Sequence, residues 1–449
     1  MTLLGIFNSN LICFIQILIN LGFFLLHRLP DLKTVTMNII YSFIPLLLVL
    51  FLSPYCLRAQ ENETLTLEQA IKLAVNNNPG IELSQADIEI SKAGIRQAKS
   101  AYYPQISSRL IIPFIGRESG FYLDQLIWDF GRTSNRVKSS KAALESSGFR
   151  KDSTRDDLIL DTIIAYYTIL SDKHIAASLE KRVTEAQKRL ERTTSFFESE
   201  RASELDVTKS EANLSDVKLE LSRADNNLEL SNFRLKTLMG QEDEFDLKLE
   251  DVSGYNKKIF DLKESIDQAL GTRPELKEIR AREVSTKANL EVSKKEFYPI
   301  VFGRTAYRFE GKGAQTPGFI AGVGVKFPIF EGFSRFGKLQ EAKAGIRKVK
   351  SEMEVAKANI VSEVKELYLD LEFAEENILV RHKTKESAQK TLVLAQERYR
   401  QGRASEVELA EAESLFETSK AKYMQALYTY NINVAKLERA IGGMYEPQQ

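Results

Sequence analysis

The chain has 449 residues, and its 62 basic and 62 acidic side chains cancel to a formal net charge of zero. Nucleic-acid-binding proteins carry a basic surplus, so this balance gives no support to that class. Charged residues make up 28% and hydrophobic residues 43% of the chain, which indicates an ordered, helix-rich protein rather than a disordered one.

Residues 1–59 are expected to form a leader that is removed from the mature protein. Residues 39–52 are an apolar run of 14, a length that fits a signal peptide and is too short for a membrane-spanning helix. We expect translation to start near Met37 and cleavage to occur near Ala59. The alternative is a membrane-anchored helical hairpin, since residues 11–26 form a second apolar stretch. Both cysteines lie in the leader, so the mature chain would contain no thiol, which suits an oxidising periplasm or cell surface.

The rest of the chain contains an internal duplication. The segment Arg201–Asp206 returns as Arg403–Glu408 at an offset of 202 residues, whereas Tyr103-Pro104 returns as Tyr298-Pro299 at an offset of 195. Two copies of roughly 180 residues are too long for a solenoid unit and indicate a duplicated half-structure. We therefore divide the mature chain into a first repeat at 60–240, a connector at 241–261, a second repeat at 262–443 and a tail at 444–449.

Each repeat is expected to contain a short helix, a β-hairpin, a long helix and a return helix, in that order. The long helices have no helix-breaking residue. In the second one, apolar residues from Leu339 to Leu371 recur at steps of three and four, which predicts a left-handed supercoil. The predicted bounds are about 66–101, 104–128, 132–195 and 204–239 in the first repeat, and about 262–296, 299–328, 334–398 and 406–441 in the second.

The hairpin of the second repeat has the alternation of a transmembrane-barrel strand pair. Val301, Thr305 and Tyr307 alternate with small or charged residues such as Arg304, and the strand lengths suit a tilted span. The hairpin of the first repeat is less regular and is inferred from its homology with the second. Aromatic residues at the hairpin bases suit an interfacial girdle or, alternatively, packing where the strands meet the helices: Tyr102, Tyr103, Trp128, Phe297, Tyr298 and Phe330.

Four strands in one chain cannot close a barrel, and open sheet edges are not tolerated in lipid. The chain is therefore expected to oligomerise. Eight strands leave little lumen, whereas twelve leave room for a pore, so a trimer is the smallest assembly that could form a duct.

The order and spacing of several residues near the C-terminus resemble the signature of TolC-like outer-membrane efflux proteins: Tyr399, Gly402, Ser405, Glu408, Ala412, Ile441 and Gly442. The Tyr-Pro pair before each hairpin fits the same pattern. The resemblance covers about residues 64–443, which is nearly the whole mature chain.

This resemblance implies a mostly α-helical fold with transmembrane β-hairpins. A homotrimer would form a twelve-stranded β-barrel in the outer membrane of a Gram-negative bacterium, continued by a twelve-helix periplasmic α-barrel. It also implies an exit duct of a tripartite efflux or type I secretion system, which receives cargo from a periplasmic adaptor and an inner-membrane transporter. The alternatives are a channel that works without a pump and a structural periplasmic coiled-coil protein, and the cargo stays open.

The same resemblance implies a gate at the periplasmic entrance. Glu408 and Glu411 lie one turn apart on a helix face, and threefold symmetry would bring six carboxylates towards the axis, an arrangement that favours cations. A solvated helix face is the other interpretation of these two residues. A hydrogen bond between Tyr399 and Asp206 would hold the entrance closed. The arginine that the family has in this latch falls on Ala404 in this chain.

The resemblance also implies that the adaptor docks at the two turns between long and return helices. The docking residues would be Arg201, Ala202, Ser203, Gly402, Arg403, Ala404 and Ser405. Independently of docking, Ser203 and Ser405 are expected to be the N-caps of the return helices, because each is followed by acidic residues in the first turn.

Catalysis is not expected. After the leader, the chain has only two histidines, His174 and His382, and it has no cysteine. No phosphate-binding glycine loop or zinc-type spacing occurs. The sequence thus predicts no catalytic residue, no metal site and no cofactor.

Overall fold

The structure is a computed structural model that describes residues 64–109, 120–241, 247–251, 254–308 and 318–443. The chain divides into two compact units, Met1–Glu63 and Thr64–Gln449, and all described residues belong to the second. The predicted leader with its start and cleavage positions, the two hairpin loops and the C-terminal tail lie outside the described residues. In the described part of the chain, no helix combines the length and the apolar character needed to cross a bilayer.

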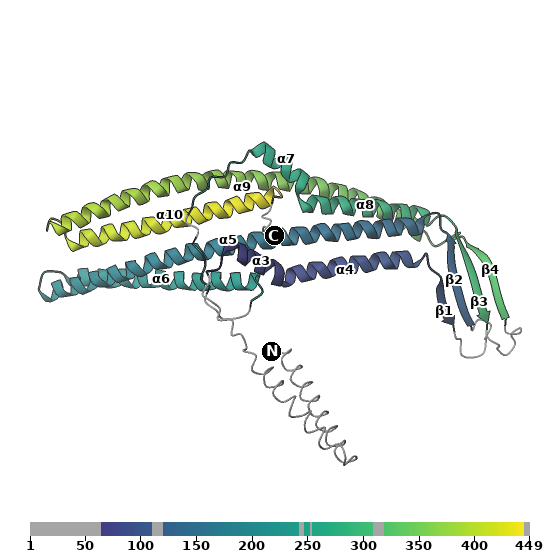
Figure 1. The fold of residues 1–449 in the computed structure, drawn as a ribbon, viewed down its shortest axis with the longest axis horizontal. Helices are drawn as coiled ribbons and strands as arrows, with labels where there is room; N and C mark the ends of the chain where they lie inside the picture. Colours follow the sequence, from purple (N-terminus) through teal and green to yellow (C-terminus); the bar gives the residue numbers. More distant parts are fainter. Residues whose placement is uncertain (1–63, 110–119, 242–246, 252–253, 309–317, 444–449) are drawn as a thin grey trace, which may run out of the picture. The chain divides into compact units, whose positions relative to one another are not determined.

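The elements follow the predicted order in both repeats (Figure 1). The first repeat contains α3 (Leu67–Asn77), α4 (Pro79–Ser100), β1 (Gln105–Arg109), β2 (Gly120–Trp128), α5 (Arg132–Glu198) and α6 (Glu204–Leu238). The second contains α7 (Leu262–Thr272), α8 (Pro274–Lys295), β3 (Ile300–Arg308), β4 (Gly318–Lys326), α9 (Ser334–Arg400) and α10 (Glu406–Ala440). The long helices α5 and α9 have 67 residues each, and the return helices α6 and α10 have 35 each. The two halves therefore match element by element.

The prediction of one short helix before each hairpin is wrong, because each of these segments is two helices that meet at a proline. Pro79 is the first residue of α4, and Asn78 before it has an extended backbone (φ −69°, ψ 126°). A proline ring has no N–H to donate and disfavours helical geometry in the preceding residue, so the helix stops there. Pro274 divides the equivalent segment into α7 and α8.

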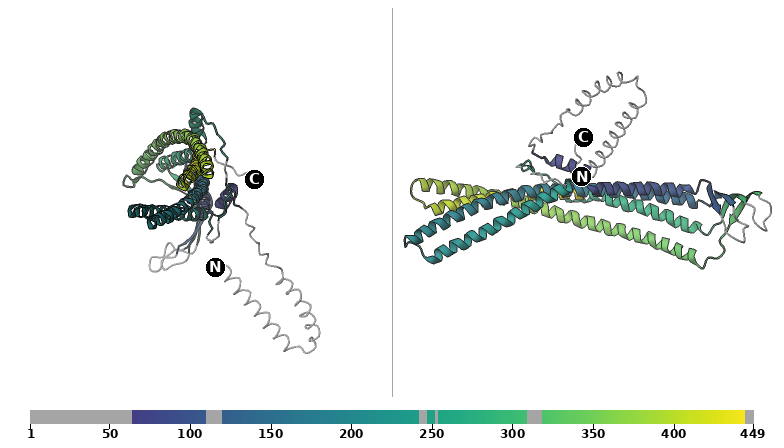
Figure 2. Two further views of the ribbon diagram at one scale, coloured as in Figure 1. Left: turned by 90° about the vertical axis from the view of Figure 1, so that its left-hand side faces the viewer. Right: turned by 90° about the horizontal axis from the view of Figure 1, so that it is seen from below.

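The long helices hold the described elements together. α5 packs against both α6 and α10, and α9 packs against α10, so the pair α5–α6 lies beside the pair α9–α10 (Figures 1 and 2). The predicted apolar seam of α9 is buried at Val349, Ile360 and Val364. Its heptad-like spacing is the reason that one face of this otherwise charged helix packs continuously.

Two apolar clusters lie where the short helices meet the long ones. One is centred on Tyr166 and Tyr428 and the other on Tyr430 and Val364. The fully buried Tyr166 donates its hydroxyl to the carbonyl oxygens of Leu65 at 3.0 Å and Glu250 at 2.8 Å. A buried phenol needs such a partner, and this one fixes the connector to α5.

The four strands form one antiparallel sheet in the order β1-β2-β3-β4. Strand β2 pairs with β3, so the sheet joins the hairpins of the two repeats, and a β-bulge between Leu126 and Trp128 ends the regular register. The hairpin predicted in the first repeat only by homology is confirmed by the pairing of β1 with β2. Within the described chain, β1 and β4 each pair on one side only.

The two faces of the sheet differ in chemistry. Partners that lie directly opposite in an antiparallel pair share a face. One face carries Tyr307 opposite Phe319, with Val323 and Val325 further along β4, and all four side chains are exposed. The other face carries Arg304 opposite Asp124, joined by two hydrogen bonds of 2.5 and 2.9 Å. The predicted division into an apolar and a polar face is confirmed for β3 and β4.

Candidate functional site

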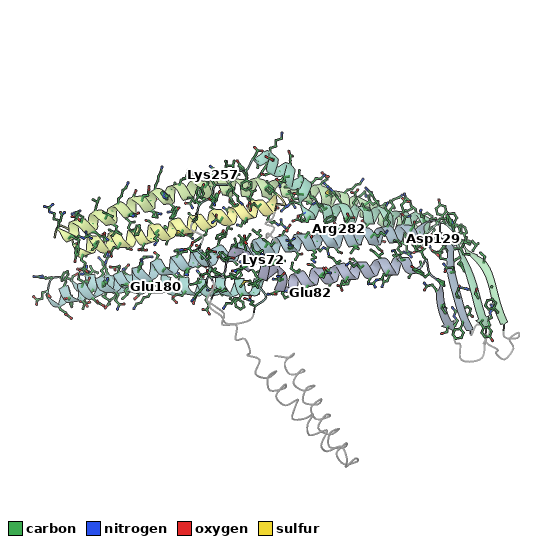
Figure 3. The ribbon with its side chains drawn as sticks, in the orientation of Figure 1. Lys72, Glu82, Asp129, Glu180, Lys257 and Arg282 are labelled. Atoms are coloured by element: carbon green, nitrogen blue, oxygen red, sulfur yellow. The ribbon has the colours of Figure 1, made fainter. Side chains whose placement is uncertain are left out.

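The sheet joins the helices at an acidic turn that ends β2. Asp129 is labelled in Figure 3 where the helices meet the sheet. Its carboxylate accepts hydrogen bonds from the backbone N–H of Gly131 at 3.0 Å and of Thr133 at 2.6 Å, which satisfies two amides at the start of α5. Next to it, the Phe130 ring stacks on Tyr298 with centroids 5.2 Å apart, while Trp128 is exposed. The aromatic residues at this junction thus combine mutual packing with exposed surface.

The two predicted docking turns lie at the opposite ends of the long helices from the sheet (Figure 1). The chain enters each turn through a residue in the left-handed region, Glu200 at φ 56° in the first repeat and the equivalent Gly402 at φ 69° in the second. The following amides close the ends of the helices: Arg201 N–H donates to the Phe196 carbonyl at 2.7 Å, and Arg403 N–H donates to the Arg398 carbonyl at 2.8 Å. The two tips therefore share one backbone geometry.

The predicted helix caps at the tips are confirmed. The Ser203 hydroxyl accepts from the Asp206 N–H at 3.3 Å, and the Asp206 carboxylate accepts from the Ser203 N–H at 3.1 Å, which completes a capping box. In the second tip, the Ser405 hydroxyl accepts from the Glu408 N–H at 3.2 Å. Both return helices therefore begin at a serine.

Two of the predicted gate residues, Asp206 and Tyr399, are not joined in the described chain. The Asp206 carboxylate also accepts from the Ser203 hydroxyl at 2.7 Å, and this hydrogen bond is the main reason that the pKa of Asp206 lies below its ordinary value. Tyr399, in the last turn of α9, is exposed, and it makes no hydrogen bond to Asp206 within the described residues. A latch between them would need a different rotamer or a neighbouring copy of the chain.

Each acidic residue near the start of α10 faces an arginine of another helix. Glu408 lies 2.7 Å from Nη1 of Arg398 on α9. Glu411 lies 3.4 Å from Nη2 of Arg189 on α5. Glu406, two residues before Glu408, lies 2.6 Å from Arg192 Nη2 in a third ion pair. The arginines of α5 were not identified from the sequence, although Arg182, Arg189 and Arg192 recur at the spacing of one helix face.

A cavity of about 550 Å³ lies beside these ion pairs, between α5, α6 and α10. The charged side chains that line it are Arg182, Glu185, Arg189, Arg192, Glu411 and Lys422. Four of these six are basic, so the wall of the cavity next to Glu411 is not the purely acidic surface that the gate residues alone suggest.

Comparisons with known proteins support the assignment to a family of outer-membrane channels. Residues 265–443 match the family described as outer membrane efflux protein. The chain is 22% identical over 329 residues to Nodulation protein T of Rhizobium leguminosarum bv. trifolii, covering 71% of this chain and 70% of that protein. It is also 22% identical over 335 residues to the outer membrane efflux protein BepC of Brucella suis, covering 70% and 71% of the two chains.

Solved structures of outer-membrane channels have the same fold. The outer-membrane channel OprN superposes with a TM-score of 0.69 at 19% identity, over 84% of this chain and 90% of OprN. The CmeC outer membrane channel of Campylobacter jejuni gives 0.70 at 18% identity, over 85% and 87% of the two chains. The fold is therefore that of these mostly helical outer-membrane channels. The match of residues 265–443, the two relatives and the shared fold thus agree with the resemblance to TolC-like outer membrane efflux proteins that the motifs of the chain indicate.

Proposed function

We propose that three copies of this chain assemble into a homotrimer in the outer membrane of a Gram-negative bacterium. The twelve strands would close into a β-barrel, and the helices would continue it as a twelve-helix α-barrel in the periplasm. The observation that carries this proposal is the sheet, in which β1 and β4 each lack a second partner in the described chain and one face exposes apolar side chains. In lipid, the open edges need the strands of neighbouring copies, and the apolar face needs acyl chains to cover it.

In this assembly the chain acts as the passive exit duct of a tripartite efflux or type I secretion system. A periplasmic adaptor docks at the two tips, through Arg201–Ser203 and Gly402–Ser405, and an inner-membrane transporter supplies the energy. The exposed serine-capped turns support this role, because they offer two equivalent sites on each copy of the chain. Glu408 and Glu411 line the narrow part of the entrance. A hydrogen bond between Asp206 and Tyr399 holds the entrance closed.

The experiment for this function combines the purified protein with a deletion strain. The detergent-purified protein should be a trimer, show β signal in circular dichroism and form ion channels in planar bilayers. The deletion strain should become more sensitive to drugs or lose secretion of a polypeptide. Channels with unchanged susceptibility and secretion across a broad panel would favour the alternative of a pump-independent channel, and a monomer that is soluble without detergent would contradict the proposal.

The latch has its own test. Asp206→Ala combined with Tyr399→Phe should raise single-channel conductance in planar bilayers, because it removes the hydrogen bond proposed to hold the entrance closed. Asp216→Ala, an exposed aspartate further along α6, is the matched control and should leave conductance unchanged. Equal conductance of the double variant and the wild type would remove the latch from the proposal.

A further inference from the structure

The carboxylates near the start of α10 do not stand alone in this chain. Three arginines from two other helices lie within 2.6 to 3.4 Å of Glu406, Glu408 and Glu411. Two of these arginines, Arg189 and Arg192, come from the same face of α5, which packs against α10. The acidic side chains and their partners therefore belong to one charged layer across α5, α9 and α10.

The exposure of these pairs decides what they can do. The side chains of Arg189 and Glu411 are 44% and 64% exposed, and those of Arg192 and Glu406 are 22% and 54% exposed, so each pair has at least one side chain that is more than half exposed. Ion pairs this accessible to water add little to stability, so they are weak candidates for a mechanical clamp. Their charges nevertheless stay in the wetted region, where they act on ions that pass within the Debye length, about 10 Å at roughly 0.1 M ionic strength.

The neighbouring cavity adds to the positive side of this layer. It is lined by Arg182, Arg189, Arg192 and Lys422 against only two acidic residues, Glu185 and Glu411. Arg182 is itself paired with Glu220 at 2.7 Å, whereas Lys422 has no ion pair within the described residues. The field next to Glu411 is thus balanced or slightly positive.

We propose that Arg189 and Arg192 determine the ion selectivity of the periplasmic entrance. They neutralise Glu411 and Glu406, so the entrance is close to charge-balanced and discriminates weakly between cations and anions, although it contains rings of carboxylates. This inference rests on the proposed function and adds two selectivity-determining residues to its gate.

Reversal potentials in planar bilayers under a KCl gradient test the inference. The current through the wild-type channel should have a reversal potential near zero. Arg189→Gln with Arg192→Gln should leave Glu406 and Glu411 uncompensated and raise the permeability ratio of K⁺ to Cl⁻ severalfold. Glu406→Gln with Glu411→Gln should shift this ratio in the opposite direction. In the variant with all four changes, the reversal potential should return towards zero.

Two controls separate charge from structure. Arg189→Lys with Arg192→Lys keeps both charges and should keep the wild-type reversal potential. Arg150→Gln removes another α5 arginine, paired with Glu278 at 2.9 Å, and should also change nothing. A variant with Arg189→Gln and Arg192→Gln that conducts with the wild-type reversal potential would overturn the inference. A wild-type channel that is already strongly cation-selective would overturn it too. A wild-type protein that forms no channel would instead overturn the proposed function, and the inference with it.

Discussion

The residues that begin the two tips have unequal conformational costs. Glu200 and Gly402 occupy equivalent positions of the repeat, both in the left-handed region. Glycine adopts this backbone freely, whereas a residue with a Cβ loses about 1 kcal/mol there. The first tip therefore carries strain that the second lacks, and the hydrogen bonds of the Ser203 cap help to offset it.

Asp206 makes the first tip sensitive to acid. Hydrogen bonds from Ser203 lower the pKa of the Asp206 carboxyl from its ordinary value of 3.8. A group whose pKa is lower in the folded than in the unfolded state stabilises the fold above its unfolded-state pKa, and this contribution is lost as the pH falls through the folded-state pKa. The capping box should therefore loosen only below a pH of about 3.8.

Hydrogen exchange of the peptide that starts α6, measured across the acidic range, tests this expectation. Protection in the wild type should fall as Asp206 becomes protonated. Asp206→Asn should lower protection at neutral pH and remove the acid-dependent loss. Asp216→Asn on the same helix should behave as the wild type does. If protection in the Asp206→Asn variant depends on pH as it does in the wild type, protonation of Asp206 is not the cause of the acid-dependent loss.

At the level of elements, the long helices were predicted well and the short ones were not. α5 and α9 extend only two or three residues beyond the predicted ends at 195 and 398, because no breaker interrupts their apolar period. The breaks before Pro79 and Pro274 were missed since apolar residues continue on both sides, although proline at a first helical position is itself a start signal. Backbone chemistry here outweighs the hydrophobic pattern.

The ion pairs of the candidate site could be predicted only in part. The serine caps were found because a cap and its partner lie three residues apart in the sequence. Arg189 and Glu411 are separated by 222 positions, and only the packing of α5 on α10 brings them together. Sequence periodicity gives the face of each helix but not the neighbour that it meets.

A second interhelical contact of this kind joins the two repeats at Arg439. Its guanidinium, 14% exposed, donates from Nη2 to Glu275 of α8 and lies 2.6 Å from Asp157 of α5. Removing one partner of a buried pair costs about 3–5 kcal/mol, because a charge is left uncompensated. Since Asp157 and Glu275 are partly exposed, we expect Arg439→Ala to lower the free energy of unfolding by about 2 kcal/mol, below that range.

Thermal unfolding followed by helical circular dichroism in detergent measures this loss. The matched control is Arg234→Ala, which breaks a surface pair of α6 and α5, 3.6 Å from Asp161, with side chains 60% and 49% exposed. Exposed pairs contribute about 0–1 kcal/mol, so the control should melt close to the wild type. Similar melting of the two variants would mean that the Arg439 contact does not couple the helices.

For the whole molecule, the division of the sheet into two faces is the feature that specifies an assembly. The face with Tyr307, Phe319 and Val323 has no covering element among the described residues, whereas the opposite face keeps its charges in the pair of Arg304 and Asp124. A soluble protein would bury the apolar face under a helix. In the proposed barrel, lipid covers that face and water meets the other, so adjacent positions of β4 should differ sharply in what they tolerate.

Lysine substitutions at two neighbouring residues near the middle of β4 test this difference. Val323, 72% exposed, lies on the apolar face, while Gly322 lies opposite Arg304 on the polar face with open space around it. A lysine facing the middle of the bilayer costs about 2–4 kcal/mol in each copy of the chain, and a lysine facing the lumen costs far less. Val323→Lys should therefore sharply reduce the amount of detergent-resistant trimer recovered from outer membranes, whereas Gly322→Lys should retain most of it. Equal recovery of the two variants would contradict the lipid-facing assignment, and a reversed order would mean that the barrel is closed with the opposite face outward.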